Sequence, residues 1–154
     1  MDNLPRLYFY LSGILITSAG FTLLSTDLLP LLATPGFKGI LTLLLFGLIY
    51  LNIVFVVTRR FMRRLDGPTN VPYIFAVLVA IVPVFWILVY DAGLMPNTRF
   101  LFAGVMAVTP FVGAFFGHKA GLKAQAKFKQ QVLDYLKKTG QLPEEFQDTT
   151  DNQK

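Results

Sequence analysis

The sequence predicts an all-α integral membrane protein, with four transmembrane helices arranged as two antiparallel hairpins and a C-terminal basic amphipathic helix on the cytoplasmic side. The 154-residue chain is 54% hydrophobic with a mean hydropathy of +0.55, which is more apolar surface than one soluble core of this size can bury. Four uncharged stretches approach the roughly 20 residues that cross a hydrocarbon core of about 30 Å. Lys and Arg gather in alternate connections, as they do when basic loops stay in the cytoplasm.

The predicted spans form one bundle within residues 1–117. Each is apolar around its whole circumference, as expected of a helix that faces lipid. Turn-forming residues occur in the connections, and short connections imply antiparallel neighbours. A cleaved signal peptide is the alternative for the first span, but its apolar region exceeds the usual length of about 7 to 15 residues and its basic region holds only Arg6. The spans cover about residues 7–26, 39–58, 71–90 and 100–117.

Basic residues predict the orientation. The connections after the first and third spans hold only Lys38 and Arg99. We therefore expect the more basic connection and both termini in the cytoplasm. The clustered cations form a candidate surface for anionic lipid headgroups or a partner, and their position beside apolar spans argues against nucleic acid. They follow the second and fourth spans and are Arg59, Arg60, Arg63, Arg64, Lys119, Lys123, Lys127, Lys129, Lys137 and Lys138.

Small residues at helical spacing predict where helices pack closely. In lipid the hydrophobic effect does not drive helices together, so close approach through small side chains must do so. Packing within one bundle is the default expectation, and packing against another subunit is the alternative. One stripe lies in the first span and the other begins in the fourth: Gly13, Thr17 and Gly20, and Gly113, Gly117 and Gly121.

One amide side chain, that of Asn52, lies within the four predicted spans. At about 1.5 Å per residue, Asn52 and Ser12 lie at similar depths from the cytoplasmic side. We expect a hydrogen bond between Asn52 and Ser12 or the neighbouring Tyr10. This intramembrane polar contact would contribute about 0.6 kcal/mol to stability.

Pro83 and Pro110 lie in the middle of the third and fourth spans. Each removes a backbone donor and frees the carbonyl four residues earlier, at Val79 and Met106, which bends the helix. No polar lining is expected beside these prolines, so the sequence favours fixed bends over the hinges of a gate.

Residues 118–140 predict the basic amphipathic helix. Apolar side chains between Leu122 and Leu136 fill one half of the helical wheel, and most of the lysines fill the other half. Such a helix lies on the inner leaflet, packs on the Arg-rich connection of its own or a second copy, or docks a partner protein; membrane-surface binding is the plainest interpretation. Residues 141–154 form an acidic tail whose composition predicts disorder.

No catalytic, metal or cofactor site is predicted, and the protein is not expected to be an enzyme. The chain has no Cys, which removes thiolate chemistry. No titratable acid, base or His lies in the middle of a span, which disfavours proton-coupled transport. His118 has no acidic cluster near it in the sequence and is interpreted as a polar residue near a helix end.

Association is therefore the expected role. The leading hypothesis is a non-catalytic accessory, assembly or scaffolding subunit, acting through helix packing in the bilayer and through the basic helix, with a membrane protein or a second copy as partner. The alternative is a small oligomeric channel or passive transporter lined by the third and fourth spans. No residue assigns the chain to one cellular membrane, such as a bacterial inner membrane or a related energy-transducing membrane.

Overall fold

The computed structural model describes residues 4–34, 36–64, 70–90 and 94–139, and within them it is helical without strands. Four of its helices are long and apolar enough to cross a membrane, so the prediction of an all-helical multi-pass membrane protein is confirmed. The acidic tail, residues 141–154, lies outside the described residues. The elements are α1 (Leu4–Leu24), η1 (Thr26–Ala33), α2 (Phe37–Arg64), α3 (Val71–Val89) and α4 (Pro96–Thr139).

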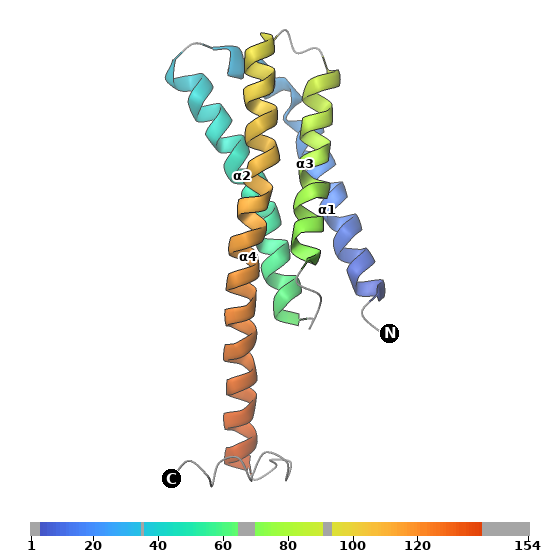
Figure 1. Ribbon diagram of the computed structural model, residues 1–154, viewed down its shortest axis with the longest axis vertical. Coiled ribbons are helices and arrows are strands. Elements are labelled where there is room, and N and C mark those ends of the chain that lie inside the picture. Colours follow the sequence, from blue (N-terminus) through green and yellow to red (C-terminus); the bar gives the residue numbers. More distant parts are fainter. Residues whose placement is uncertain (1–3, 35, 65–69, 91–93, 140–154) are drawn as a thin grey trace.

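The turn between η1 and α2 depends on glycine. Gly36 has a φ of 86°, in the left-handed region that favours glycine. At Gly39, an added Cβ would lie 2.6 Å from the carbonyl oxygen of Thr34. These two glycines let the first turn of α2 lie against the last residues of η1, and α2 begins to the left of η1 in Figure 1.

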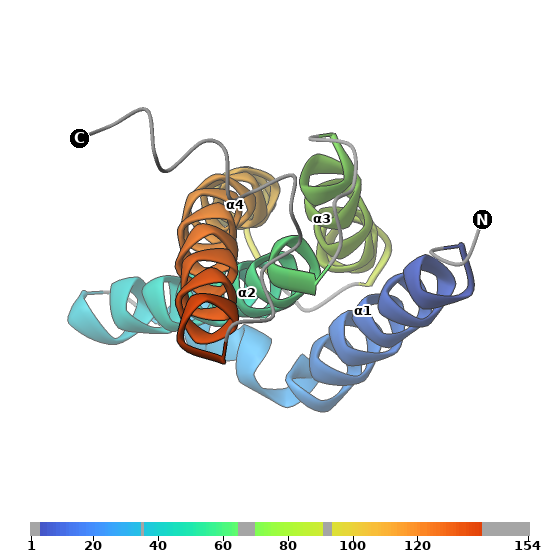
Figure 2. The ribbon, with the colours of Figure 1, turned by 90° about the horizontal axis from the view of Figure 1, so that it is seen from below.

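Successive long helices run in opposite directions, so the N-terminus of α1 and the C-terminus of α2 lie at the same end of the bundle (Figure 1). The most extensive packing joins α2 and α4, which are not neighbours in sequence, and α3 packs next most closely on α4. α1 lies at the edge of the bundle and contacts mainly α3 (Figure 2). These contacts do not confirm a division into two hairpins.

The core consists of apolar side chains from the inner faces of all four long helices. Two chains of edge-to-face aromatic contacts connect the helices near opposite ends of the bundle. Tyr10 of α1 contacts Phe61 of α2, which contacts Phe75 of α3. Phe21 of α1 contacts Phe46 of α2, which contacts Phe102 of α4. The fully buried side chains of the core include Ile14, Tyr50, Val54, Phe75, Val79, Ile87 and Met106.

The fourth span and the basic segment are one helix. α4 runs without a break for 44 residues, about 66 Å at 1.5 Å per residue. Gly121 is its last buried residue, and beyond it α4 projects from the bundle alone (Figure 1). We call residues 122–139 the distal segment of α4.

Candidate interaction surfaces

The glycine stripe of α4 packs inside the molecule, against the backbone of α2. An added Cβ at Gly117 would lie 2.7 Å from the carbonyl oxygen of Phe55, and one at Gly121 would lie 2.6 Å from Cβ of Met62. At Gly113 an added Cβ would collide with the carbonyl oxygen of Leu51. Glycine at these three positions therefore permits the closest helix contact in the bundle.

The stripe of α1 faces the other way. Gly13 and Thr17 are exposed, Gly20 is half-buried, and an added Cβ at either glycine would meet nothing within 4 Å. The hydroxyl of Thr17 donates to the carbonyl of Gly13 in the same helix. We call Gly13, Thr17 and Gly20 the outer stripe of α1. It does not form the intramolecular packing face that was the default expectation.

The predicted hydrogen bond from Asn52 to Ser12 or Tyr10 is formed with neither residue. Ser12 donates instead to the carbonyl of Phe9 in its own helix, and Asn52 is exposed. The reason is helical geometry, because Asn52 is two residues, about 200°, from Tyr50 and from Val54, which point into the core. Similar depth in the membrane therefore did not place Asn52 and Ser12 on facing sides of their helices.

A buried polar cluster joins α1, α2 and α3. Ser18 of α1 donates to the carbonyl of Val79 at 3.1 Å, and Val79 is the residue whose carbonyl Pro83 frees. Thr22 donates to the carbonyl of Ser18 at 2.7 Å, and its hydroxyl lies 2.5 Å from that of Tyr50. Since the single proton of Thr22 is used on Ser18, the Tyr50 hydroxyl is the donor to Thr22.

This cluster was not predicted from the sequence, and the expectation of no polar lining is wrong at Pro83. The sequence pattern that could have predicted the cluster is in α1, where Ser18, Thr22 and Ser25 follow one another at intervals of four and three residues. All three are buried in the structure. Outside this cluster, Thr109 beside Pro110 has a buried hydroxyl without a hydrogen-bond partner.

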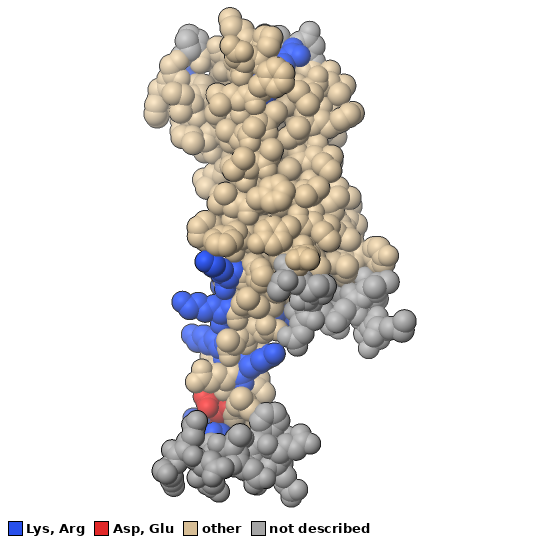
Figure 3. All heavy atoms as spheres, in the orientation of Figure 1, with Lys and Arg blue, Asp and Glu red and all other residues tan. Residues whose placement is uncertain are grey.

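Basic side chains gather at one end of the bundle and along the distal segment of α4 (Figure 3). Lys119 lies over the ring of Phe115 at 4.3 Å from its centroid. The opposite end carries Lys38 and Arg99, and the Arg99 Nε donates to the carbonyl of Leu94. The exposed cations of the basic end and of the distal segment are Arg59, Arg60, Arg63, Arg64, Lys119, Lys123, Lys127, Lys129, Lys137 and Lys138.

The distal segment of α4 also exposes apolar side chains. Phe128, Val132 and Leu133 line one shallow apolar patch together with Lys129. A helix that leaves the bundle has no helix beside it to cover such a face. The exposed apolar residues of the segment are Leu122, Phe128, Val132, Leu133 and Tyr135.

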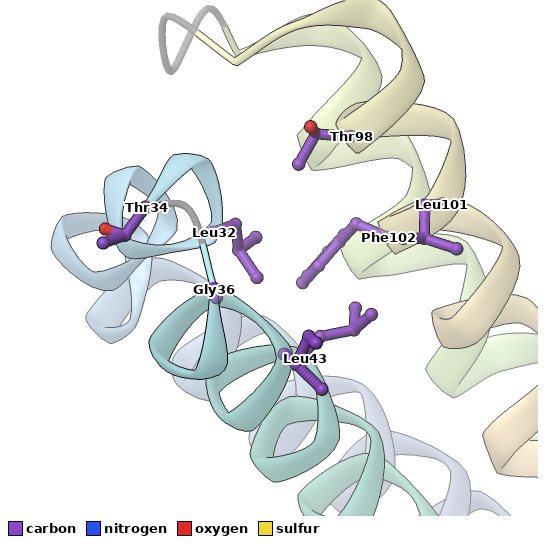
Figure 4. Close-up of a pocket in the computed structure, with 9 residues that line it drawn as sticks. Leu32, Thr34, Gly36, Leu43, Thr98, Leu101 and Phe102 are labelled. Atoms are coloured by element: carbon purple, nitrogen blue, oxygen red, sulfur yellow. The ribbon is translucent and has the colours of Figure 1, made fainter.

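A small cavity of about 220 Å³ lies at the other end, where α2 leans away from α4. Leu32, Leu43 and Phe102 point toward one another across it (Figure 4). Thr34 and Thr98 are its hydroxyl-bearing residues. The lining has no titratable side chain, so we assign no chemistry to this cavity.

Within the part of the chain that the structure describes, no three metal-ligating side chains come together. His118 is half-buried, and its Nε2 is buried without a hydrogen-bond partner. No family model, curated protein or solved structure matches the chain. Function is therefore argued from the surfaces alone.

Proposed function

We propose that the protein is a non-catalytic accessory or assembly subunit of a membrane protein complex. Its four spans insert with both termini in the cytoplasm, because the basic residues of α2 and α4 gather at one end (Figure 3) and cations are retained on the cytoplasmic side. The distal segment of α4 then projects into the cytoplasm, and the outer stripe of α1 faces the bilayer.

The observation that carries this proposal is the unbroken course of α4 beyond the bundle. A helix continuous with a membrane span leaves the bilayer along the axis of that span, so its apolar face cannot lie flat on the leaflet. Most helical stability in proteins comes from packing of an apolar face, and no described helix of the bundle covers the apolar face of the distal segment. A cytoplasmic partner that covers Phe128 and Val132 supplies that packing.

The outer stripe of α1 supports a second contact within the membrane. Small residues without neighbours let another helix approach the backbone closely. The two contacts differ in chemistry, since α1 offers close dispersion contacts in lipid and the distal segment offers an apolar face flanked by lysines in water.

A pull-down of the tagged full chain from its native membrane in mild detergent tests the proposal. We expect a defined partner with the intact chain and its loss after truncation at Gly121. A double variant, Phe128→Ser with Val132→Ser, gives the same loss if the apolar face binds. Gln130→Ser with Gln131→Ser, on the polar face of the same turns, is the matched control and retains the partner. Recovery of the same partner by the truncated chain contradicts the proposal.

A small oligomeric channel is the second candidate, and the hydroxyl cluster beside Pro83 favours it. Ser18, Thr22 and Tyr50 are nearly or fully buried in one molecule, so a conducting path would need α1 to separate from α2 and α3. Ion flux in liposomes that contain the purified chain alone supports this candidate, and tight liposomes contradict it.

A further inference from the structure

Asn52 is exposed on the outside of the bundle, within the apolar part of α2. In α2 it lies 14 residues from Lys38 and seven from Arg59, about 21 Å and 10 Å along the helix axis. The short side chain of Asn52 reaches neither membrane surface from that position. Its amide is therefore exposed to hydrocarbon in an isolated molecule.

The exposed Ser and Thr side chains of the spans form hydrogen bonds within their own helices. The hydroxyls of Ser12, Thr17 and Thr42 each donate to a carbonyl three or four residues earlier in the same helix. Asn52 makes no side-chain hydrogen bond to any described residue. An unpaired amide in lipid costs free energy that a hydrogen bond from another helix recovers.

The residues around Asn52 form a continuous face. Leu41, Leu45, Leu48 and Asn52 follow one another at intervals of four, three and four residues, and all are exposed. At 100° per residue they lie within a sector of about 60°. The bundle leaves this face exposed, although Leu51 and Phe55 on the adjoining side of α2 lie against α4. Intervals of three and four are the spacing of a helix–helix seam.

We propose that this face pairs with the same face of a second copy of the chain, with the two Asn52 amides hydrogen-bonded to each other. Copies of one protein insert in the same orientation, so a two-fold axis normal to the membrane brings Asn52 opposite Asn52 at equal depth. An amide is both donor and acceptor, which makes the pair self-complementary. Arg59, one heptad further, lies at the membrane surface, where its long side chain turns outward into water.

This inference is independent of the proposed accessory role, because it concerns the purified chain alone and a different face from the outer stripe of α1. The chain has no Cys, so single-cysteine variants report contacts directly. In liposomes at low protein density, Leu48→Cys is expected to form a disulfide dimer on mild oxidation. Ile81→Cys is the matched control, since Leu48 is 61% and Ile81 55% exposed. Leu48 lies 11 residues from Arg59, and Ile81 lies ten residues from Val71 at the same end of the bundle.

The role of the amide is tested in the Leu48→Cys background. Asn52→Leu is expected to reduce the disulfide dimer to the level of Ile81→Cys, and Asn52→Gln, which keeps an amide, is expected to retain it. Thermal unfolding of the Asn52→Leu monomer in detergent is expected to be unchanged, because no bond inside the molecule is lost.

Three results overturn the proposal. The first is equal cross-linking of Leu48→Cys and Ile81→Cys. The second is a Leu48→Cys dimer that Asn52→Leu leaves intact, which assigns the contact to leucine packing alone. The third is a fall in the unfolding temperature of the Asn52→Leu monomer, which places the amide inside the bundle.

Discussion

Single residues of this protein act through their distance to a neighbouring backbone. Gly117 and Gly13 are both glycines in spans, yet the first lies against the carbonyl of Phe55 and the second meets nothing within 4 Å. The same contrast separates Ser18, which bonds another helix, from Thr17, which bonds its own. Substitutions at neighbouring positions of one helix are therefore expected to change the free energy of unfolding by different amounts.

Gly117→Leu is expected to lower the free energy of unfolding by about 1–3 kcal/mol, because the side chain forces α4 away from α2. Denaturant titration in mixed micelles measures the change. Gly13→Leu introduces the same volume on the open side of α1 and is expected to leave monomer stability unchanged. Equal effects of the two variants would contradict the packing described here.

Ser18 and Pro83 are expected to be coupled through the carbonyl of Val79. Ser18→Ala leaves that carbonyl without a donor and is expected to cost about 0.6–1.7 kcal/mol. In the Pro83→Ala background residue 83 regains its backbone N–H, which bonds Val79, so Ser18→Ala is expected to cost less. A double-mutant cycle measures the coupling, and strict additivity would show that the hydroxyl does not serve this carbonyl.

At the scale of elements, α4 joins an apolar span to the distal segment in one continuous helix. Its buried glycines fix one half against α2, and no residue between Gly121 and Thr139 interrupts the helix. A proline, or a pair of glycines, after Gly121 would have interrupted the helix between the span and the distal segment. Displacement of the distal segment is therefore expected to move the span of α4 as well.

Spin labels at Phe116→Cys and Tyr135→Cys are expected to give one narrow distance distribution, centred near the roughly 28 Å that nineteen residues of helix span. Both positions are exposed, so the labels do not disturb packing. Ala124→Pro is expected to broaden the distribution or shift it to shorter distances, because proline removes a backbone hydrogen bond in the distal segment. Ala124→Ser is the control. A broad distribution in the unaltered helix would contradict a continuous α4.

At the scale of the whole molecule, charge sets the orientation and the lipid-facing surface sets what can associate. Cations lie at both ends, but the end of the bundle that includes Arg59 and the distal segment carries most of them. In the membrane this asymmetry orients the protein. The faces of α1 and α2 that point outward are then available to other helices.

Impermeant maleimide tests this orientation, again because the chain has no Cys. Lys38→Cys is expected to react in intact cells, and Lys123→Cys only after the membrane is permeabilised. Both side chains are exposed, so folding does not hide either one. The opposite pattern of labelling would reverse the assigned orientation.

The sequence by itself determined the fold class and the number of spans, because the thickness of the bilayer sets how many apolar residues a spanning helix needs. It also located the carbonyl that Pro83 frees, because that follows from covalent geometry. It could not tell that Ser18 bonds that carbonyl or that Asn52 is exposed on the outside of the bundle. Those outcomes depend on the rotation of each helix about its axis.

Only the tertiary structure decided those rotations. All four spans are apolar around their circumference, so a helical wheel shows no inner face, unlike the wheel of a helix in water. Close contact with α2 selected the glycine stripe of α4 for packing and left that of α1 open. The physical reason is that every face of an apolar helix is equally stable in lipid. Helix packing and a few hydrogen bonds therefore determine which face points into the bundle.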